Sequence, residues 1–98
     1  IQRRHTIMVI TDVKIHTVLN NSRIIAYASV VIDDWLMIRD LRLVQGNNRL
    51  FVAMPSRKLA EGGFADMVHP IFEDVRESIE LSVFNAYYDL LADEYSTM

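Results

Sequence analysis

The spacing of apolar residues changes once along this 98-residue chain, and that change constrains the fold more than any other feature. Before about residue 55, apolar residues alternate with polar ones or form short β-branched runs, as they do in strands. Further along they recur every three or four residues, as on one face of an amphipathic helix. These positions are Ile71, Phe72, Val75, Ile79, Val83, Ala86 and Leu90. The pattern predicts a sheet followed by one long helix at about residues 71–92.

Four strands are predicted in the first half of the chain, at residues 8–16, 24–32, 35–44 and 49–54. The turns between them are Asn20-Asn21-Ser22, Asp33-Asp34 and Gln45-Gly46-Asn47-Asn48. Such short turns leave no room for crossover helices, so the sheet is expected to be an antiparallel meander of four to five strands. The second strand has almost no polar residue, and we expect it to be covered on much of both faces. Gly and Asn favour a turn at the last of these positions because they tolerate positive φ.

The length allows one α+β domain, residues 1–98, in which the helix covers one face of the sheet. The chain has no cysteine, which excludes disulfides, thiolate zinc sites and cysteine nucleophiles. That composition fits a reducing cytoplasm. No apolar run approaches the roughly 18 residues that a membrane span needs, and nothing resembles a signal peptide. A cytoplasmic protein without a membrane partner is therefore expected.

The net charge of −3 conceals two halves of opposite sign. Residues 1–58 carry nine basic and four acidic side chains, a net charge of +5, whereas residues 59–98 carry one basic and nine acidic ones, a net charge of −8. One interpretation is a basic surface and an acidic surface that bind different partners; the other is that the sheet and the helix have differently charged solvated faces. Overall acidity therefore does not exclude an anionic partner.

No catalytic pattern is present. His5, His16 and His69 are scattered without the short spacing of a metal site. The glycines lack the spacing of a phosphate-binding loop, and the serines lack a nucleophile elbow. Asp33 and Asp34 are neighbours that point to opposite sides, so they are interpreted as turn residues and not as an acid–base pair. We predict no enzyme activity, catalytic residue, metal, cofactor or small-molecule substrate.

The segment RLFVAMPSRKLAEGGF, residues 49–64, is the remaining candidate site. Pro55 ends the fourth strand because it cannot donate a hydrogen bond. Ser56 could cap a single helical turn that the paired glycines would end, which places a short exposed turn at about residues 56–63. That turn presents two adjacent cations suited to phosphate contacts, Arg57 and Lys58. An ordinary solvated loop is the alternative.

The stretch DLRLVQGNNRLFVAMPSRK, residues 40–58, resembles the stage V sporulation protein G (SpoVG) family, whose pattern is approximately D-I-R-V-I-x-G-N-N-x-L-F-V-A-M-P-S-K-R. Matching residues flank it and extend the resemblance to about residues 10–92: Thr11-Asp12-Val13, Ala28-Ser29, Phe64, Asp66 and His69-Pro70-Ile71. The resemblance implies a small dimeric protein in which the sheets of two subunits associate. It also implies a bacterial cytoplasmic regulator of septation and sporulation that binds DNA and RNA.

In the family, the segment after Met-Pro-Ser is the nucleic-acid contact element. The resemblance therefore implies phosphate contacts from Arg57 and Lys58, with Arg42 and Arg49 as supporting charge. This chain departs from the family at Leu59, Ala60 and Glu61, where the pattern has Thr-Pro-Asp, and at Ala65, where it has arginine. The alternative function is a protein-interaction module of the septation machinery that binds no nucleic acid. Such a module would use a sheet edge or the acidic helix, through Glu73, Asp74, Glu77, Glu80 and Asp89.

Overall fold

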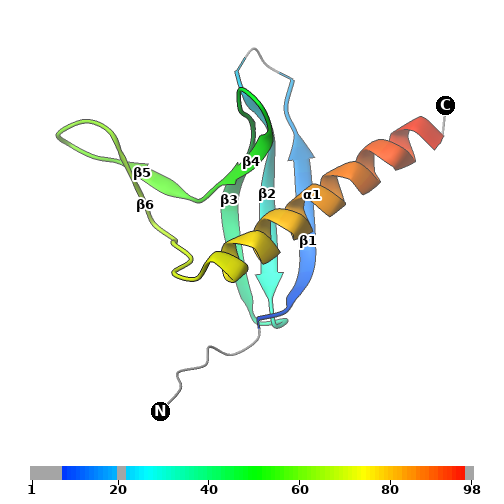
Figure 1. Ribbon diagram of the computed structural model, residues 1–98, viewed down its shortest axis with the longest axis horizontal. Coiled ribbons are helices and arrows are strands. Elements are labelled where there is room, and N and C mark those ends of the chain that lie inside the picture. Colours follow the sequence, from blue (N-terminus) through cyan, green and yellow to red (C-terminus); the bar gives the residue numbers. More distant parts are fainter. Residues whose placement is uncertain (1–7, 20–21, 97–98) are drawn as a thin grey trace.

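The structure is a computed structural model that describes residues 8–19 and 22–96. Its elements are β1 (Ile10–Thr17), β2 (Ile24–Ile32), β3 (Leu36–Gln45), β4 (Leu50–Ala53), β5 (Ser56–Lys58), β6 (Phe64–Asp66) and α1 (Glu73–Ser96). The first four strands form an antiparallel sheet in the order β1-β2-β3-β4, and α1 crosses one face of it (Figure 1). The predicted α+β meander with one C-terminal helix is confirmed. A separate two-stranded sheet, β5–β6, was not predicted.

The core lies between α1 and one face of the four-stranded sheet. Its buried side chains are Ala26, Ala28, Val30, Leu41, Leu43, Val52, Met54, Ile79 and Val83. Along β2 every second residue is buried, whereas Tyr27 on the other face is 40% exposed. The expectation that β2 is covered on much of both faces is met fully only on the α1 side, since on the other face Ile25, Ser29 and Val31 are partly buried and Tyr27 is exposed. We call the face opposite α1 the outer sheet face.

The helix begins two residues later than predicted and ends four residues later. The carbonyl of Phe72 accepts a hydrogen bond from the Arg76 N–H at 3.2 Å, so Phe72 is the last residue before the helix. Pro70 consequently lies outside the first turn, and Ile71 is 80% exposed instead of packing on the sheet. The first turn carries Glu73 and Asp74, whose charge suits the positive end of the helix dipole.

Two turns of the meander reverse the chain with different backbone conformations. At the β2–β3 turn, Asp33 (φ 53°) and Asp34 (φ 65°) form a tight reversal closed by a hydrogen bond from Trp35 N to Ile32 O at 3.1 Å. At the β3–β4 turn, neither Gly46 nor the two asparagines adopt the positive φ that these residue types tolerate. Glycine is needed at position 46 for space instead: an added Cβ would lie 2.9 Å from the carbonyl oxygen of Arg49. Residues 20–21 of the first predicted turn lie outside the described residues.

A β-bulge interrupts β3. Ala28 pairs with Leu41 and Val30 pairs with Ile38, so two residues of β3 oppose the single Ser29. The extra residue is accommodated at Asp40, which has φ 66°. Because of the bulge, Ile38 and Leu41 both pack with the core. The two residues between them, Arg39 and Asp40, are left exposed on the outer sheet face.

After β4 the chain leaves the body of the protein as a β-hairpin, residues 56–66 (Figure 1). The single helical turn predicted here is wrong, since Ser56–Lys58 is a strand paired with Phe64–Asp66. Gly62 (φ 101°) and Gly63 (φ 83°) reverse the chain in a conformation that favours glycine. The glycine pair therefore closes a hairpin and does not end a helix.

Candidate nucleic-acid interface

Arg57 and Lys58 are both exposed on β5, but the strand separates their side chains. Neighbouring residues of a strand point to opposite faces, so Arg57 lies across from Ala65 on one face and Lys58 across from Phe64 on the other. Within the described part of the chain neither side chain has a hydrogen-bond or ion-pair partner. The two cations are available to a ligand, but they flank the hairpin instead of forming the single patch that a turn would have made.

Arg42 fixes the base of the hairpin. Its Nη2 donates to the carbonyl oxygen of Met54 at 2.9 Å and to Oγ of Ser56 at 3.2 Å. The guanidinium thus bridges the end of β4 and the start of β5, on either side of the buried Pro55. Arg42 therefore positions the hairpin relative to β4. The prediction that its charge also supports ligand binding stays a prediction.

Arg49 is exposed in the β3–β4 turn, at the opposite end of β4 from the hairpin. Met54 lies five positions further along the chain, which corresponds to about 17 Å along an extended strand. The structure therefore does not bring Arg49 together with Arg57 and Lys58.

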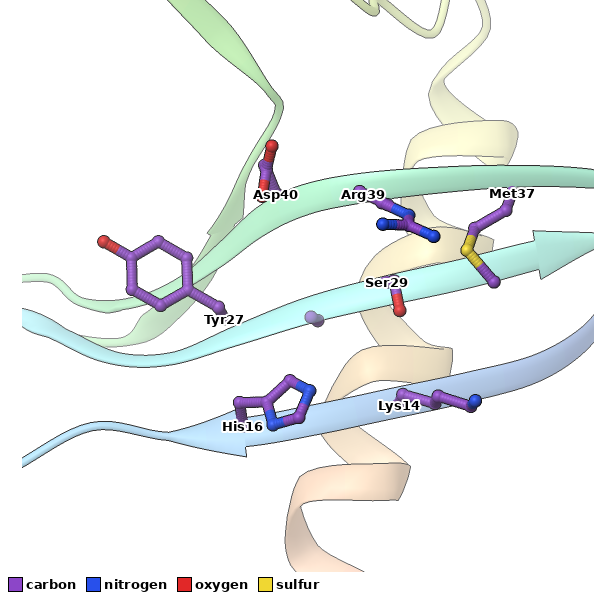
Figure 2. Close-up of a pocket in the computed structure, with 8 residues that line it drawn as sticks. Lys14, His16, Tyr27, Ser29, Met37, Arg39 and Asp40 are labelled. Atoms are coloured by element: carbon purple, nitrogen blue, oxygen red, sulfur yellow. The ribbon is translucent and has the colours of Figure 1, made fainter.

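The outer sheet face contains a hollow that the sequence patterns did not predict. It has a volume of about 350 Å³ and is lined by three strands: Lys14 and His16 from β1, Tyr27 and Ser29 from β2, and Arg39 and Asp40 from β3 (Figure 2). Alternation along β1 already places Lys14 and His16 on one side. Alternation along β3 does not predict that Arg39 lies on this face, because it would place Arg39 on the same side as the buried Leu41. Only the bulge moves Arg39 to the outer sheet face.

Groups of metal-ligating side chains and fully buried polar side chains are both absent from the described residues. No three His, Cys, Asp or Glu residues of residues 8–19 and 22–96 are grouped so that they could hold a metal ion. In the same part of the chain no polar or charged residue is fully buried. Nor is any described helix long and apolar enough to cross a membrane. His16 lies on the outer sheet face, His69 is exposed, and His5 lies outside the described residues.

Comparison with known proteins agrees with this architecture. Residues 8–89 match the SpoVG family. A protein of Acholeplasma laidlawii named "Putative septation protein SpoVG" is 42% identical over 87 residues, which cover 89% of this chain and 93% of that protein. Proteins with the same name are 41% identical in Macrococcus caseolyticus, over 93% of this chain and 79% of the relative, and 44% identical in Shouchella clausii, over 82% of each. The chain belongs to the SpoVG family.

Proposed function

We propose that this protein is a homodimeric regulator that binds DNA or RNA through its β5–β6 hairpin, and that it acts in septation, as the names of its relatives indicate. The observation that carries the proposal is the hairpin itself. It extends from the body of the protein and presents Arg57 and Lys58 without any described anionic partner. Cations on a projecting element reach phosphate groups that a flat surface of net negative charge would repel.

The proposed dimer rests on apolar side chains that this chain leaves uncovered. Met67 and Ile71, in the segment that leads from the hairpin to α1, are 58% and 80% exposed. Two large apolar side chains exposed within one short segment support an interaction surface there. A dimer would also present two hairpins, so that each weak phosphate contact is used twice.

Fluorescence anisotropy with labelled oligonucleotides, in single-stranded and duplex form, tests the binding. Arg57→Ala and Lys58→Ala should each weaken binding and lower the slope of log K against log salt by about 0.9 on duplex DNA for each phosphate that the variant no longer neutralises. Arg23→Ala removes an exposed arginine just before β2 and is the matched control. Binding that is unchanged in both hairpin variants would show that the hairpin is not the contact element.

A gain of binding gives a sharper test of the same site. Ala65 stands directly across from Arg57, at the position where the family pattern has arginine. Ala65→Arg would place two cations side by side on one face of the hairpin. We expect tighter binding and a salt slope that is steeper by the equivalent of about one phosphate.

Sedimentation equilibrium tests the dimer. Ile71→Glu should shift the protein toward monomer, because it places a charge in the proposed apolar interface. Leu81→Glu, at an exposed leucine on α1, is the control and should leave the mass unchanged.

One observation favours the alternative protein-interaction module. Leu81 and Tyr88 are 59% and 53% exposed and lie seven residues apart, hence on one face of α1. Glu80, which the sequence predicts for such a surface, is instead engaged within the chain, where it accepts a hydrogen bond from Val52. If no oligonucleotide binds at low salt, this face of α1 becomes the first surface to test for a protein partner.

A further inference from the structure

The hollow on the outer sheet face combines cationic and aromatic side chains in an arrangement that suits one nucleotide. Lys14 and Arg39 come from strands on either side of β2, and neither has an ion-pair partner among the described residues. In Figure 2 the guanidinium of Arg39 extends toward Ser29, whereas the carboxylate of Asp40 is directed away from it. The single lining carboxylate therefore leaves the two cations free to bind a phosphate.

Tyr27 supplies the other half of the hollow. It is 40% exposed in the middle of the sheet, and its register partner on β1 is His16. A tyrosine on an open sheet face is a platform on which an unpaired base stacks. The volume of about 350 Å³ is at the lower end of the range for small-ligand pockets, as expected for a single nucleotide unit.

The hollow is connected to the hairpin through Arg42. Tyr27 pairs directly with Arg42 on β3, so the two side chains emerge on the same face about 5 Å apart at the backbone. The Arg42 guanidinium in turn contacts Ser56, the residue before Arg57. A flexible polyanion bound at the hairpin would therefore continue over Arg42 to Tyr27.

We propose that the outer sheet face is a binding site for single-stranded nucleic acid, with a base on Tyr27 and a neighbouring phosphate between Lys14 and Arg39. This inference rests on the proposed function and adds the class of nucleic acid. A duplex keeps its bases stacked within the helix, so it cannot place one on Tyr27, whereas a single strand exposes every base to stacking. The hairpin then contacts phosphates of either form, and the sheet face selects the single strand.

The test is an anisotropy titration of the full chain with a labelled 12-nucleotide single strand, as DNA and as RNA, and with the matching duplex. Tyr27→Leu should weaken single-strand binding by about 5- to 150-fold, the effect of removing one stacked base, and should leave duplex binding unchanged. Lys14→Ala and Arg39→Ala should each lower the single-strand salt slope by about 0.7. The controls are Tyr88→Leu, at an exposed tyrosine on α1, and Arg23→Ala.

The outcomes separate this inference from the proposed function. If the hairpin variants weaken binding but Tyr27→Leu behaves as Tyr88→Leu does, the hairpin function stands and the sheet-face site is refuted. If Tyr27→Leu changes the sedimentation mass, the outer sheet face is covered by a second copy and the inference is also refuted. Amide NMR shifts give a readout without mutation: added single strand should shift Ser29, Arg39 and Asp40, and shifts confined to residues 56–66 would overturn the proposal.

Discussion

Replacing Glu80 by alanine tests how α1 is held against the sheet. Oε2 of Glu80 accepts a hydrogen bond from the backbone N–H of Val52 at 3.1 Å, and the contact is partly buried. Val52 lies on β4, the edge strand of the sheet, and is only 2% exposed. An edge strand has backbone groups without a strand partner, and here a carboxylate from the helix satisfies one of them. Loss of that carboxylate leaves a largely buried amide unpaired.

The expected loss of stability follows from the charge on the Glu80 carboxylate that accepts the hydrogen bond. A hydrogen bond to an ionised group contributes about 1.5–3 kcal/mol, and alanine returns a few tenths of a kcal/mol through its better helix propensity. We therefore expect Glu80→Ala to lower the free energy of unfolding by about 1–3 kcal/mol, or the Tm by roughly 4–8 °C for each kcal/mol. Glu80→Gln keeps an acceptor oxygen but loses the charge, and should cost about half as much.

Urea denaturation followed by circular dichroism measures these values, at one fixed protein concentration because a dimer would make stability concentration-dependent. Glu77→Ala is the matched control: Glu77 is exposed on the same helix, beyond the first turn, and its loss should change stability by no more than about 0.5 kcal/mol. If Glu80→Ala matched Glu77→Ala, the reasoning would be refuted, and apolar packing alone would hold the helix.

Two further substitutions test the turns by the same denaturation assay. Gly46→Ala should cost about 1–3 kcal/mol, because the added Cβ lies 2.9 Å from the backbone oxygen of Arg49, which has little freedom to move. A cost below about 0.5 kcal/mol would show that the turn relaxes. Asp34→Val should cost about 1–2 kcal/mol, since a β-branched residue is strained at φ 65°, whereas Asp34→Gly should cost nothing. Equal stability of these two variants would contradict the assigned backbone conformation.

The local pattern of the sequence was sufficient for the main elements. The predicted second strand, residues 24–32, has the same bounds as β2, and the alternation along β1 correctly places Val13 and Ile15 toward the core. The three- and four-residue spacing identified Ile79 and Val83, the two buried residues among those of α1 whose burial the structure describes. These features depend on which side of an element is apolar, and that information is local.

The hairpin could not be predicted because two local interpretations of its sequence were equally consistent with the residues. Ser56 and the glycine pair suit a capped helical turn as well as a strand and a reversal. The pairing with Phe64–Asp66 decides between them, and Arg42 stabilises the strand by a bond to Ser56 from fourteen residues away. One consequence is functional, since a strand places Arg57 and Lys58 on opposite faces.

The sequence alone determined the order of the first four strands and the helix, the apolar faces of β1 and α1, and the identity of the family, because these are properties of residue type and spacing. The tertiary structure decided which sheet face α1 covers, and the bulge at Arg39 and Asp40 decided which side chains the open face displays. Both depend on contacts between residues distant in the chain. A strand rich in apolar residues has the same sequence whether one face or both are buried, and only the packed chain shows that the face carrying Tyr27 is open.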